Sequence, residues 1–388
     1  MVTKSNNFIN LLIFISTSII IINFFFFVIE KSPVQYSDWL INYQGGFIRR
    51  GLPGEIFFRF YDLFKIRLDL IVFIFVSLLY LFFAVYFVQL LKKIKFNFLN
   101  LLIIFSPLSF LYPVMEQKVS GRKDIIFLFS VIILTTFLEK LKFENQKYLI
   151  FFFILISSFS HTGFFVFLPI FVTIYIIINN KISFTKLLFE LLYILFFSII
   201  VFILIFFNTS IDVDSVKKIC TSIKDFLPNC GVTDYISTLS WSLKYEINLV
   251  KTIWTKEGYI SFYSLAFLLA NAPLIFAFYN SKFTQKRYSK FNPILIFLFI
   301  NIISLPIYFI GADFGRYMYI AYISLVIIYF KSLSINFLNI KKKSFIKKKN
   351  LIILIVFLYG FTWTIPHCCN NNFKFIYKKP LLNVINEN

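Results

Sequence analysis

Arginine is rare in this chain, and its positions carry the most chemical information. Only seven of the 39 basic residues are arginines, and four of the seven fall in three short polar segments between apolar runs. They are Arg49 and Arg50 in N-Y-Q-G-G-F-I-R-R-G-L-P-G (42–54), Arg122 in S-G-R-K-D (120–124) and Arg316 in G-A-D-F-G-R (311–316). A guanidinium group is planar and permanently charged, so it can bind a phosphate or a carboxylate through two parallel hydrogen bonds. Arginines gathered on one face would therefore bind an anionic substrate.

The segment that holds Arg49 and Arg50 also has the composition of an anion-binding turn. Its stretch 45–51 contains three of the chain's 11 glycines. Glycine permits unusual backbone angles and close approach to a ligand, and successive backbone N–H groups in such a turn can form a concave anion site. A purely structural turn is the alternative. The residues that we expect to bind a diphosphate are Gly45, Gly46, Arg49, Arg50, Arg122, Lys123 and Arg316.

Three further polar residues are candidates for proton transfer. Asp38 follows the first apolar run, Asp313 lies three residues before Arg316, and His161 is one of two histidines and lies between two short apolar segments. Ionisable groups at a membrane boundary are candidates for function. Each also has a structural interpretation: Asp38 can cap a helix, Asp313 can pair with Arg316, and a lone histidine is often a satisfied core residue.

The surrounding sequence is typical of an all-α polytopic integral membrane protein. Hydrophobic residues make up 59% of the chain and charged residues 15%, and runs long enough to cross a hydrocarbon layer of about 30 Å recur from end to end. We predict a single membrane domain over residues 1–388 with about eleven transmembrane helices. The third to sixth are short, so broken or re-entrant helices are expected among them. The predicted spans lie near 8–29, 68–91, 99–114, 125–138, 148–160, 164–179, 187–207, 258–279, 293–310, 317–334 and 350–366.

Lysine-rich loops alternate with these spans and indicate an orientation. Basic residues are enriched in cytoplasmic loops, which places the five lysine-rich groups and the N-terminus inside. The arginine segments then face outward. This topology also explains the formal charge of +21, so no nucleic-acid partner is expected. The lysine-rich groups lie at 92–95, 140–147, 181–186, 282–290 and 341–349.

Two outward loops are long enough to carry structure of their own. In loop 30–67, the stretch Gly54–Leu63 has the pattern of an amphipathic helix lying in the membrane interface. Loop 208–257 holds six lysines and six acidic residues, and its Cys220 and Cys230 are ten residues apart. An oxidising compartment would let these two cysteines form a disulfide, with two free thiols as the alternative.

The chemistry that fits these residues is glycosyl transfer from a polyprenyl-diphosphate donor. Asp38 or Asp313 would take the proton of the acceptor hydroxyl, and the arginines would stabilise the departing diphosphate. The sequence contains no Walker loop, GxGxxG turn, HExxH pair or Gly-x-Ser-x-Gly elbow. Neither a cofactor nor a metal is expected.

The architecture resembles that of a known group of enzymes. Chain length, span number and a sizeable late outward loop resemble bacterial O-antigen polymerases of the Wzy type. The segment at 42–54 is similar to one in polytopic proteins of surface-polysaccharide gene clusters. An aspartate soon after the first span, followed by an interfacial helix, resembles the layout of GT-C glycosyltransferases.

This resemblance implies a GT-C-like fold and a polyprenyl-diphosphate-linked glycan as substrate. It also implies an active face on the periplasmic side of the bacterial inner membrane, with chain-length regulator and flippase proteins as partners.

Three other functions remain open. One is a GT-C transferase that adds a single sugar from a polyprenyl-phosphate donor. Another is a flippase, which would usually show inverted repeats. The third is a glycan acyltransferase, which would need a buried catalytic histidine such as His161.

Overall fold

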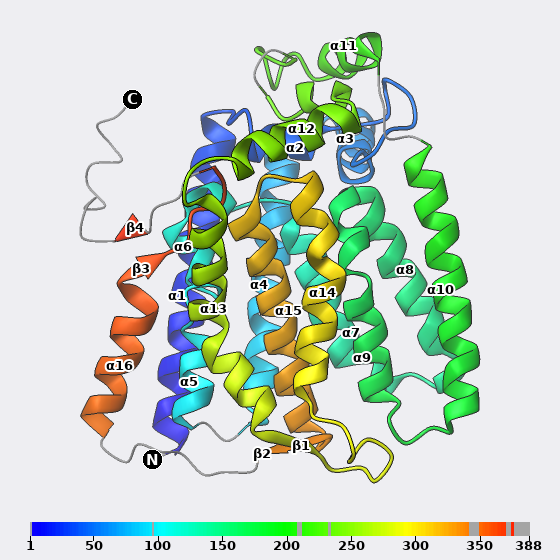
Figure 1. Cartoon of the computed structure of the whole chain (residues 1–388). Helices are drawn as coiled ribbons and strands as arrows, with labels where there is room; N and C mark the ends of the chain where they lie inside the picture. Colours follow the sequence, from blue (N-terminus) through cyan, green and yellow to red (C-terminus); the bar gives the residue numbers. More distant parts are fainter. Residues whose placement is uncertain are drawn as a thin grey trace. The chain divides into compact units, whose positions relative to one another are not determined.

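The structure, a computed structural model, describes residues 2–94, 97–207, 212–231, 234–340, 349–369 and 374–375, which are mostly α-helical (Figure 1). The chain divides into two compact units. Unit 1 comprises residues 1–16, 90–119 and 248–388, and unit 2 comprises residues 17–89 and 120–247. The single membrane domain over 1–388 stays a prediction.

Unit 2 is built on four consecutive helices that alternate in direction, namely α7 (Asp124–Phe137), α8 (Phe143–Ser160), α9 (Pro169–Ile178) and α10 (Phe184–Phe206). Figure 1 shows them side by side, and α8 contacts both α7 and α10. Most of α4 and the second part of α1 belong to the same unit. The long helices are α1 (Val2–Ile29), α4 (Leu68–Leu91), α7 (Asp124–Phe137), α8 (Phe143–Ser160), α9 (Pro169–Ile178) and α10 (Phe184–Phe206). The shorter elements are α2 (Gln35–Leu40), α3 (Leu52–Phe64), α11 (Val213–Ser222), the start of α12 (Leu243–Trp254) and the 3₁₀ helices η2 (Leu138–Lys140), η3 (Thr162–Phe167) and η4 (Ser237–Ser240).

The two ends of the unit 2 helices carry different basic residues. Arg122 and Lys123 directly precede α7, at the end of the unit where α2, α3 and α11 lie (Figure 1). The connections from α7 to α8 and from α9 to α10 lie at the other end and hold Lys140, Lys142 and Lys181. The predicted separation of arginine and lysine segments is therefore present in unit 2. Which end faces outward stays a prediction.

Unit 1 surrounds a deeply buried helix, α15. Neighbouring helices α13 and α14 pack against it, and α13 and α16 contact α5. The strands β1 and β2 pair antiparallel with Ser281 opposite Ile340, and β3 pairs with β4. The elements are α5 (Phe98–Ile104), α6 (Tyr112–Met115), η1 (Gln117–Val119), α13 (Tyr259–Tyr279), β1 (Ser281–Phe283), α14 (Ile294–Ile310), α15 (Phe314–Ser334), β2 (Leu338–Ile340), α16 (Lys349–Phe361), β3 (Trp363–Thr364) and β4 (Lys374–Phe375). Of the last lysine-rich group, residues 341–348 lie outside the described residues.

Five helices in the described residues are long and apolar enough to cross a membrane, which indicates membrane association. They cover Asn7–Ile29, Leu68–Leu91, Phe184–Phe206, Tyr259–Tyr279 and Phe314–Ser334, and the shorter apolar segments are Thr162–Ile178 and Ile294–Ile310. All seven coincide with predicted spans. The full count of about eleven spans stays a prediction.

Two of the candidate membrane helices differ strongly in how much of each is buried inside the protein. In α15, 89% of the apolar window is buried inside the protein, whereas in α10 the figure is 22%. Large apolar side chains of α10 such as Phe189 and Phe196 are exposed. Such a surface suits contact with lipid tails, which are as apolar as the side chains themselves.

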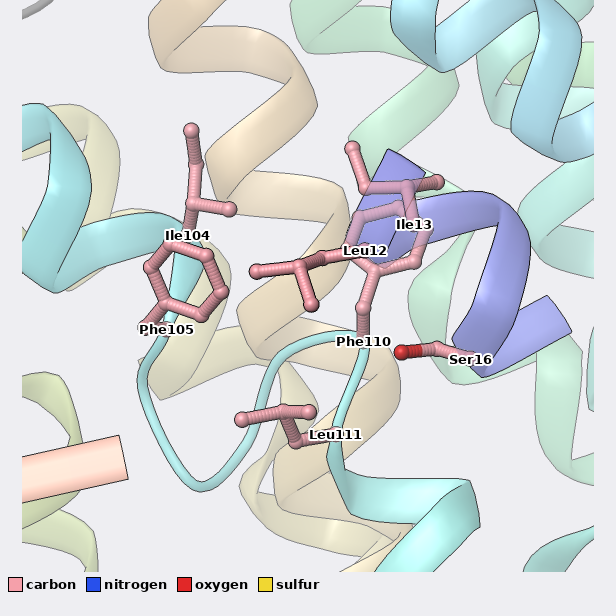
Figure 2. A pocket seen from close by; sticks show the side chains of 7 residues that line it. All are labelled: Leu12, Ile13, Ser16, Ile104, Phe105, Phe110 and Leu111. Carbon is pink, nitrogen blue, oxygen red and sulfur yellow. The ribbon is translucent and has the colours of Figure 1, made fainter. Parts of the chain in front are cut away.

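The predicted third span, 99–114, is broken. Helix α5 ends at Ile104 and α6 begins only at Tyr112. Pro107 lies between them and has no N–H to continue a helix, and the Ser106 hydroxyl donates to the Ala270 carbonyl at 2.8 Å. The break and α1 enclose an apolar cavity of about 10 Å³, with Ser16 as its polar lining residue (Figure 2). This volume holds about one water molecule and no substrate.

The amphipathic helix expected over 54–63 is present as α3. Its inner face is set by Gly54, where an added Cβ would overlap the Ile41 carbonyl oxygen. Its outer face exposes Ile56, Phe60, Leu63 and Phe64, a spacing that forms one stripe on a helix. An exposed apolar stripe beside the end of a membrane helix suits an interfacial position.

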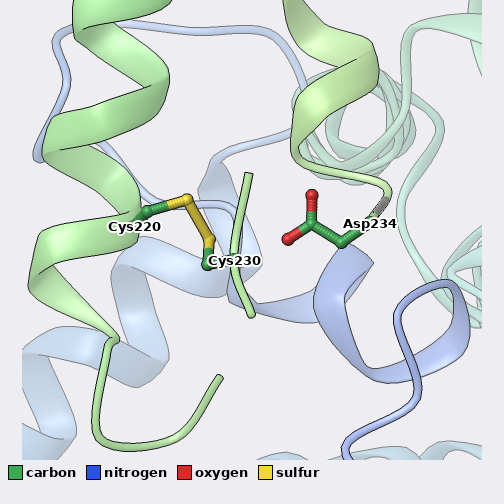
Figure 3. Close-up of side chains that lie close together, drawn as sticks. All are labelled: Cys220, Cys230 and Asp234. Carbon is green, nitrogen blue, oxygen red and sulfur yellow. A yellow bond between two sulfur atoms is a disulfide. The ribbon is translucent and has the colours of Figure 1, made fainter. Parts of the chain in front are cut away.

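The predicted disulfide between Cys220 and Cys230 is present, with the Cα atoms 5.3 Å apart (Figure 3). It joins the end of α11 to Cys230, so it closes the loop 220–230, which lies just before Asp234 and Tyr235 in the chain.

Replacing both cysteines by serine should lower the stability of the folded protein by up to about 3 kcal/mol, because the loop-closure entropy of a ten-residue loop is no longer removed from the unfolded state. The measurement is the thermal midpoint of detergent-purified protein, with reduced wild type as the control. Wild type and the double variant with equal midpoints under oxidising conditions would contradict the stabilising role.

Candidate functional site

Four predicted cationic residues from two distant segments meet in unit 2. Arg49 and Arg50 lie between α2 and α3, and Arg122 and Lys123 lie just before α7. The Lys123 ammonium donates to the Arg50 carbonyl oxygen at 2.8 Å. We call these four residues, with Asp38 and Tyr235, the arginine cluster.

Helix α2 and the turn before α7 are fixed to each other by Trp39. Its indole N–H donates to the Gly121 carbonyl at 2.6 Å, and the Gly121 N–H donates to the Tyr80 hydroxyl at 3.2 Å. Trp39 is fully buried against Phe57 of α3 and Phe75 of α4. Burial of a large aromatic side chain contributes a few kcal/mol, so this contact holds Asp38 and Lys123 in register.

Asp38 and Lys123 form a completely buried ion pair. The Lys123 Nζ lies 3.5 Å from Asp38 Oδ1, and both side chains are 0% exposed. Neither Asp38 oxygen accepts a hydrogen bond from the part of the chain that the structure describes. Burial lowers the pKa of Lys123 to about 8, and the attraction of Asp38 opposes this shift while the positive charges of Arg50 and Arg122 add to it. Desolvation therefore outweighs the ion pair.

Arg50 and Arg122 stack on the same aromatic ring. The guanidinium carbon of Arg50 lies 5.2 Å from the centre of the Tyr235 ring, and that of Arg122 lies 4.8 Å from it. The Arg122 Nη2 also donates to the Tyr235 hydroxyl at 3.2 Å. Cation–π contacts of this kind contribute about 0.5–2 kcal/mol each. Tyr235 therefore brings two guanidinium groups from different segments to one place.

Tyr235 is itself hydrogen-bonded to the loop 30–67. Its backbone N–H donates to the Pro33 carbonyl at 2.8 Å and lies 3.1 Å from the Ser37 hydroxyl oxygen. Asp234, next to it, accepts from the Gly231 and Ser237 N–H groups at 3.1 and 2.9 Å. The turn that carries Tyr235 is therefore fixed on both sides.

Arg49 is occupied by a different partner. It pairs with Glu246 at 3.1 Å and is 8% exposed. Burial lowers the pKa of Arg49, the neighbouring charge of Arg50 adds to this, and Glu246 opposes it. Arg49 therefore ties the 42–54 segment to α12.

The glycines of this segment have two different roles. Gly46 has φ 113°, which favours glycine, and its N–H donates to the Tyr43 carbonyl at 3.0 Å. Gly45 has no space for a side chain, because an added Cβ would overlap the carbonyl oxygen of Ser215 in α11. Packing against the large loop therefore explains why position 45 needs a glycine. The contact of Gly45 and Gly46 with a diphosphate stays a prediction.

Asp313 and Arg316 lie in unit 1 and pair with each other at 2.7 Å. Arg316 is 1% exposed. A second polar contact in the same unit joins Glu116, 2% exposed on its side chain, to His367 Nδ1 at 3.1 Å. The Gly315 N–H donates to the His367 carbonyl at 3.1 Å, so the 313–316 turn and the 366–367 segment are held together.

His161 has a local structural role. Its Nδ1 accepts the Gly163 N–H at 3.1 Å, which caps η3, and its ring stacks on Phe164 at 4.8 Å. An imidazole that accepts at Nδ1 carries its proton on Nε2 when neutral. In this geometry neither ring nitrogen of a neutral His161 offers a lone pair to a substrate.

Two other features have the composition of a binding site but are occupied by their own residues. The donor atoms of Cys220, Cys230 and Asp234 lie within 4.8 Å of one another. However, the two sulfurs are bonded to each other and Asp234 accepts two backbone hydrogen bonds, so this group stabilises the loop (Figure 3). A groove of about 350 Å³ between α1 and α4 has Lys31, Arg67 and Asp69 at its rim. There Arg67 makes two hydrogen bonds to Asp69, at 3.2 and 2.6 Å.

Sequence reasoning missed two residues that contact the predicted ones: Tyr235, on which Arg50 and Arg122 stack, and Glu246, which pairs with Arg49. Tyr235 and Glu246 lie in the large loop, where acidic and basic residues balance and no motif singles them out. Their role follows only from contacts with residues that lie more than 100 positions away.

The chain matches no protein-family model, and no curated protein and no solved structure is significantly similar to it.

Lys123 should make the stability of the protein depend on pH above neutrality. The folded chain releases the Lys123 proton near pH 8, whereas the unfolded chain keeps it until about pH 10.5. The unfolded state then binds more protons between these values, so stability rises with pH in this window. Between pH 7.5 and 9.5 the gain should be roughly 2 kcal/mol.

The measurement compares the thermal midpoints of wild type and Lys123→Arg at both pH values. Arginine keeps its charge throughout this range, and the other titrating groups are the same in both proteins, so the difference between the two midpoints reports on Lys123. The difference should shift in favour of wild type at the higher pH. A constant difference would show that folded Lys123 keeps its proton through this range.

Proposed function

We propose that this chain is a membrane glycosyltransferase that polymerises polyprenyl-diphosphate-linked oligosaccharide repeat units into O-antigen or a related surface polysaccharide. The observation that carries the proposal is the contact of both Arg50 and Arg122 with the Tyr235 ring, together with the hydrogen bond from Lys123 to the Arg50 carbonyl. A diphosphate carries two adjacent anionic groups, and two guanidinium groups held close together match them in charge and geometry.

The cluster would act mainly on the leaving group. As the bond between the sugar and the diphosphate breaks, negative charge grows on the phosphate oxygens, and fixed cations stabilise this charge more strongly than that of the bound substrate. Tyr235 holds both guanidinium groups in place before the substrate arrives, so little reorganisation would be needed at the moment of reaction.

The acceptor hydroxyl must lose its proton to a base. Asp38 and Asp313 are the two carboxylates proposed for this role. Asp313 is 20% exposed on its side chain and pairs with Arg316, whereas Asp38 is fully buried against Lys123. The geometry therefore supports the diphosphate-binding half of the reaction more directly than the choice of base.

The membrane setting of the proposal follows from the sequence. We place the chain in the bacterial inner membrane with about eleven spans, a GT-C-like arrangement, a cytoplasmic N-terminus and the arginine cluster on the periplasmic side. The Cys220–Cys230 disulfide is compatible with that oxidising side. Chain-length regulator and flippase proteins would be its partners.

The alternative functions receive less support from the site. A monophosphate donor carries one anionic group, whereas the two guanidinium groups of Arg50 and Arg122 on Tyr235 match the two adjacent groups of a diphosphate. An acyltransferase would need an available histidine lone pair, and His161 uses its Nδ1 to cap η3.

Arg50→Ala and Arg122→Ala should each abolish long glycan chains and leave single capped repeat units on the lipid A core. Loss of one charge-assisted contact to the leaving group should reduce polymerisation at least about tenfold. Lysine at either position should restore little, because it lacks the bidentate geometry. The measurement is the ladder of surface polysaccharide on a gel, in cells whose own copy of the gene is deleted.

Arg59→Ala is the matched control, since Arg59 lies on α3 with its side chain 62% exposed; it should leave the ladder unchanged. Immunoblots establish equal protein levels. Normal ladders from both Arg50→Ala and Arg122→Ala at normal protein level would exclude the diphosphate role.

A further inference from the structure

The backbone of Arg50 adopts a conformation that an L-residue with a long side chain rarely takes. Its φ is 68°, in the left-handed region, which is unfavourable for a residue other than glycine. The next residue, Gly51, packs against the Tyr43 ring, where an added Cβ would overlap Tyr43. This conformation aims the Arg50 side chain at Tyr235 and its carbonyl oxygen at Lys123.

Lys123 is the group that holds this carbonyl. The 2.8 Å hydrogen bond from its ammonium group to Arg50 is made by a side chain that is 0% exposed. A hydrogen bond from a charged donor is stronger than a neutral one, and a buried ammonium group has no water to replace it. Lys123 also follows Arg122 directly in the chain, so one turn places both the second guanidinium group and the support of the first.

Asp38 compensates the charge that this arrangement buries. It is the nearest carboxylate to Lys123, at 3.5 Å, and it is 0% exposed. The charged groups that act on Lys123 are Asp38, Arg50 and Arg122. Without Asp38, the two guanidinium groups of Arg50 and Arg122 would act on the buried Lys123 ammonium without this counter-charge, and like charges at short range repel strongly.

We propose that Lys123 and Asp38 are positioning residues, which form a buried support that fixes the Arg50 backbone and thereby the direction of its guanidinium group. As far as the ligand is concerned, this inference rests on the proposed function. It assigns Asp38 to the support of the cation site and not to proton transfer, since a carboxylate with 0% exposure that faces Lys123 does not touch an acceptor hydroxyl.

The first test reads the Arg50 backbone directly and needs no substrate. Limited trypsin digestion of detergent-purified full-length protein, followed by mass spectrometry, measures cleavage of the Arg50–Gly51 bond. Lys123→Met should raise the cleavage rate at this bond about tenfold or more, because the hydrogen bond to the Arg50 carbonyl is lost. Lys123→Arg, which keeps a charged donor, should restore a rate closer to that of wild type.

Lys147→Met is the matched control. Lys147 forms the ion pair with Glu190 at 3.1 Å in the same unit, so its loss tests general loosening of unit 2. It should leave cleavage after Arg50 unchanged. Equal rates in wild type and Lys123→Met, or an equal increase in Lys147→Met, would overturn the proposal.

Removal of one partner of a buried ion pair can prevent folding. The double variant Asp38→Asn/Lys123→Met removes both charges and avoids an uncompensated buried charge. It should fold and still show the raised cleavage after Arg50. A double variant that folds and resists cleavage as wild type does would also overturn the proposal.

The second test separates support from catalysis, with inorganic pyrophosphate as the probe in titration calorimetry. Asp38→Asn should weaken pyrophosphate binding about tenfold or more, in parallel with the loss of long glycans. If Asp38→Asn binds pyrophosphate as wild type does but makes no long glycans, Asp38 acts in proton transfer and the positioning role is wrong. If wild type itself binds no pyrophosphate while cleavage after Arg50 responds to Lys123→Met, the proposed function fails and the support remains.

Discussion

The arrangement of unit 2 at its arginine end depends on one buried amine. Lys123 donates to the Arg50 carbonyl and faces Asp38, so helix α2, the 42–54 segment and the distant turn before α7 meet at a single charge. A buried ammonium group is tolerated only when a counter-charge and a hydrogen-bond acceptor are both present. Asp38 of helix α2 supplies the counter-charge, and the Arg50 carbonyl of the 42–54 segment supplies the hydrogen-bond acceptor. The hydrogen bond from Trp39 to Gly121 keeps these segments in register, and the Tyr235 ring contacts the guanidinium groups of both Arg50 and Arg122.

The same constraint explains why the polar chemistry lies at helix ends. Charged groups are costly in hydrocarbon, so they gather where the apolar helices end. In unit 2 Arg49, Arg50 and Arg122 lie near α2 and α3, where they contact Glu246 and Tyr235, whereas the connections at the opposite ends hold Lys140, Lys142 and Lys181. Unit 1 has its own polar pairs beside the start of α15, an ion pair between Asp313 and Arg316 and a contact between Glu116 and His367.

Several elements were predictable because they depend on local sequence. The predicted span 68–91 coincides with α4 (Leu68–Leu91), since an unbroken apolar run leaves no other arrangement in a membrane. The disulfide and helix α3 follow from the cysteine spacing and from the amphipathic pattern. The predicted span 99–114 was interrupted instead, because Pro107 removes a donor and Ser106 bonds across to the Ala270 carbonyl. That second partner comes from a segment more than 160 residues away, and no local pattern reveals it.

The sequence by itself determined the helical, membrane-type class and the segments in which arginine replaces lysine, because both follow from composition and from the order of apolar runs. The tertiary structure decided how each of these charges is used. It assigned Arg49 to Glu246, Arg316 to Asp313 and Lys123 to Asp38, and it brought Arg50 and Arg122 to one tyrosine ring. The physical reason is one of range. Burial of apolar runs is encoded along the chain, whereas ion pairs and ring contacts act over a few ångströms between segments that only the folded chain brings together.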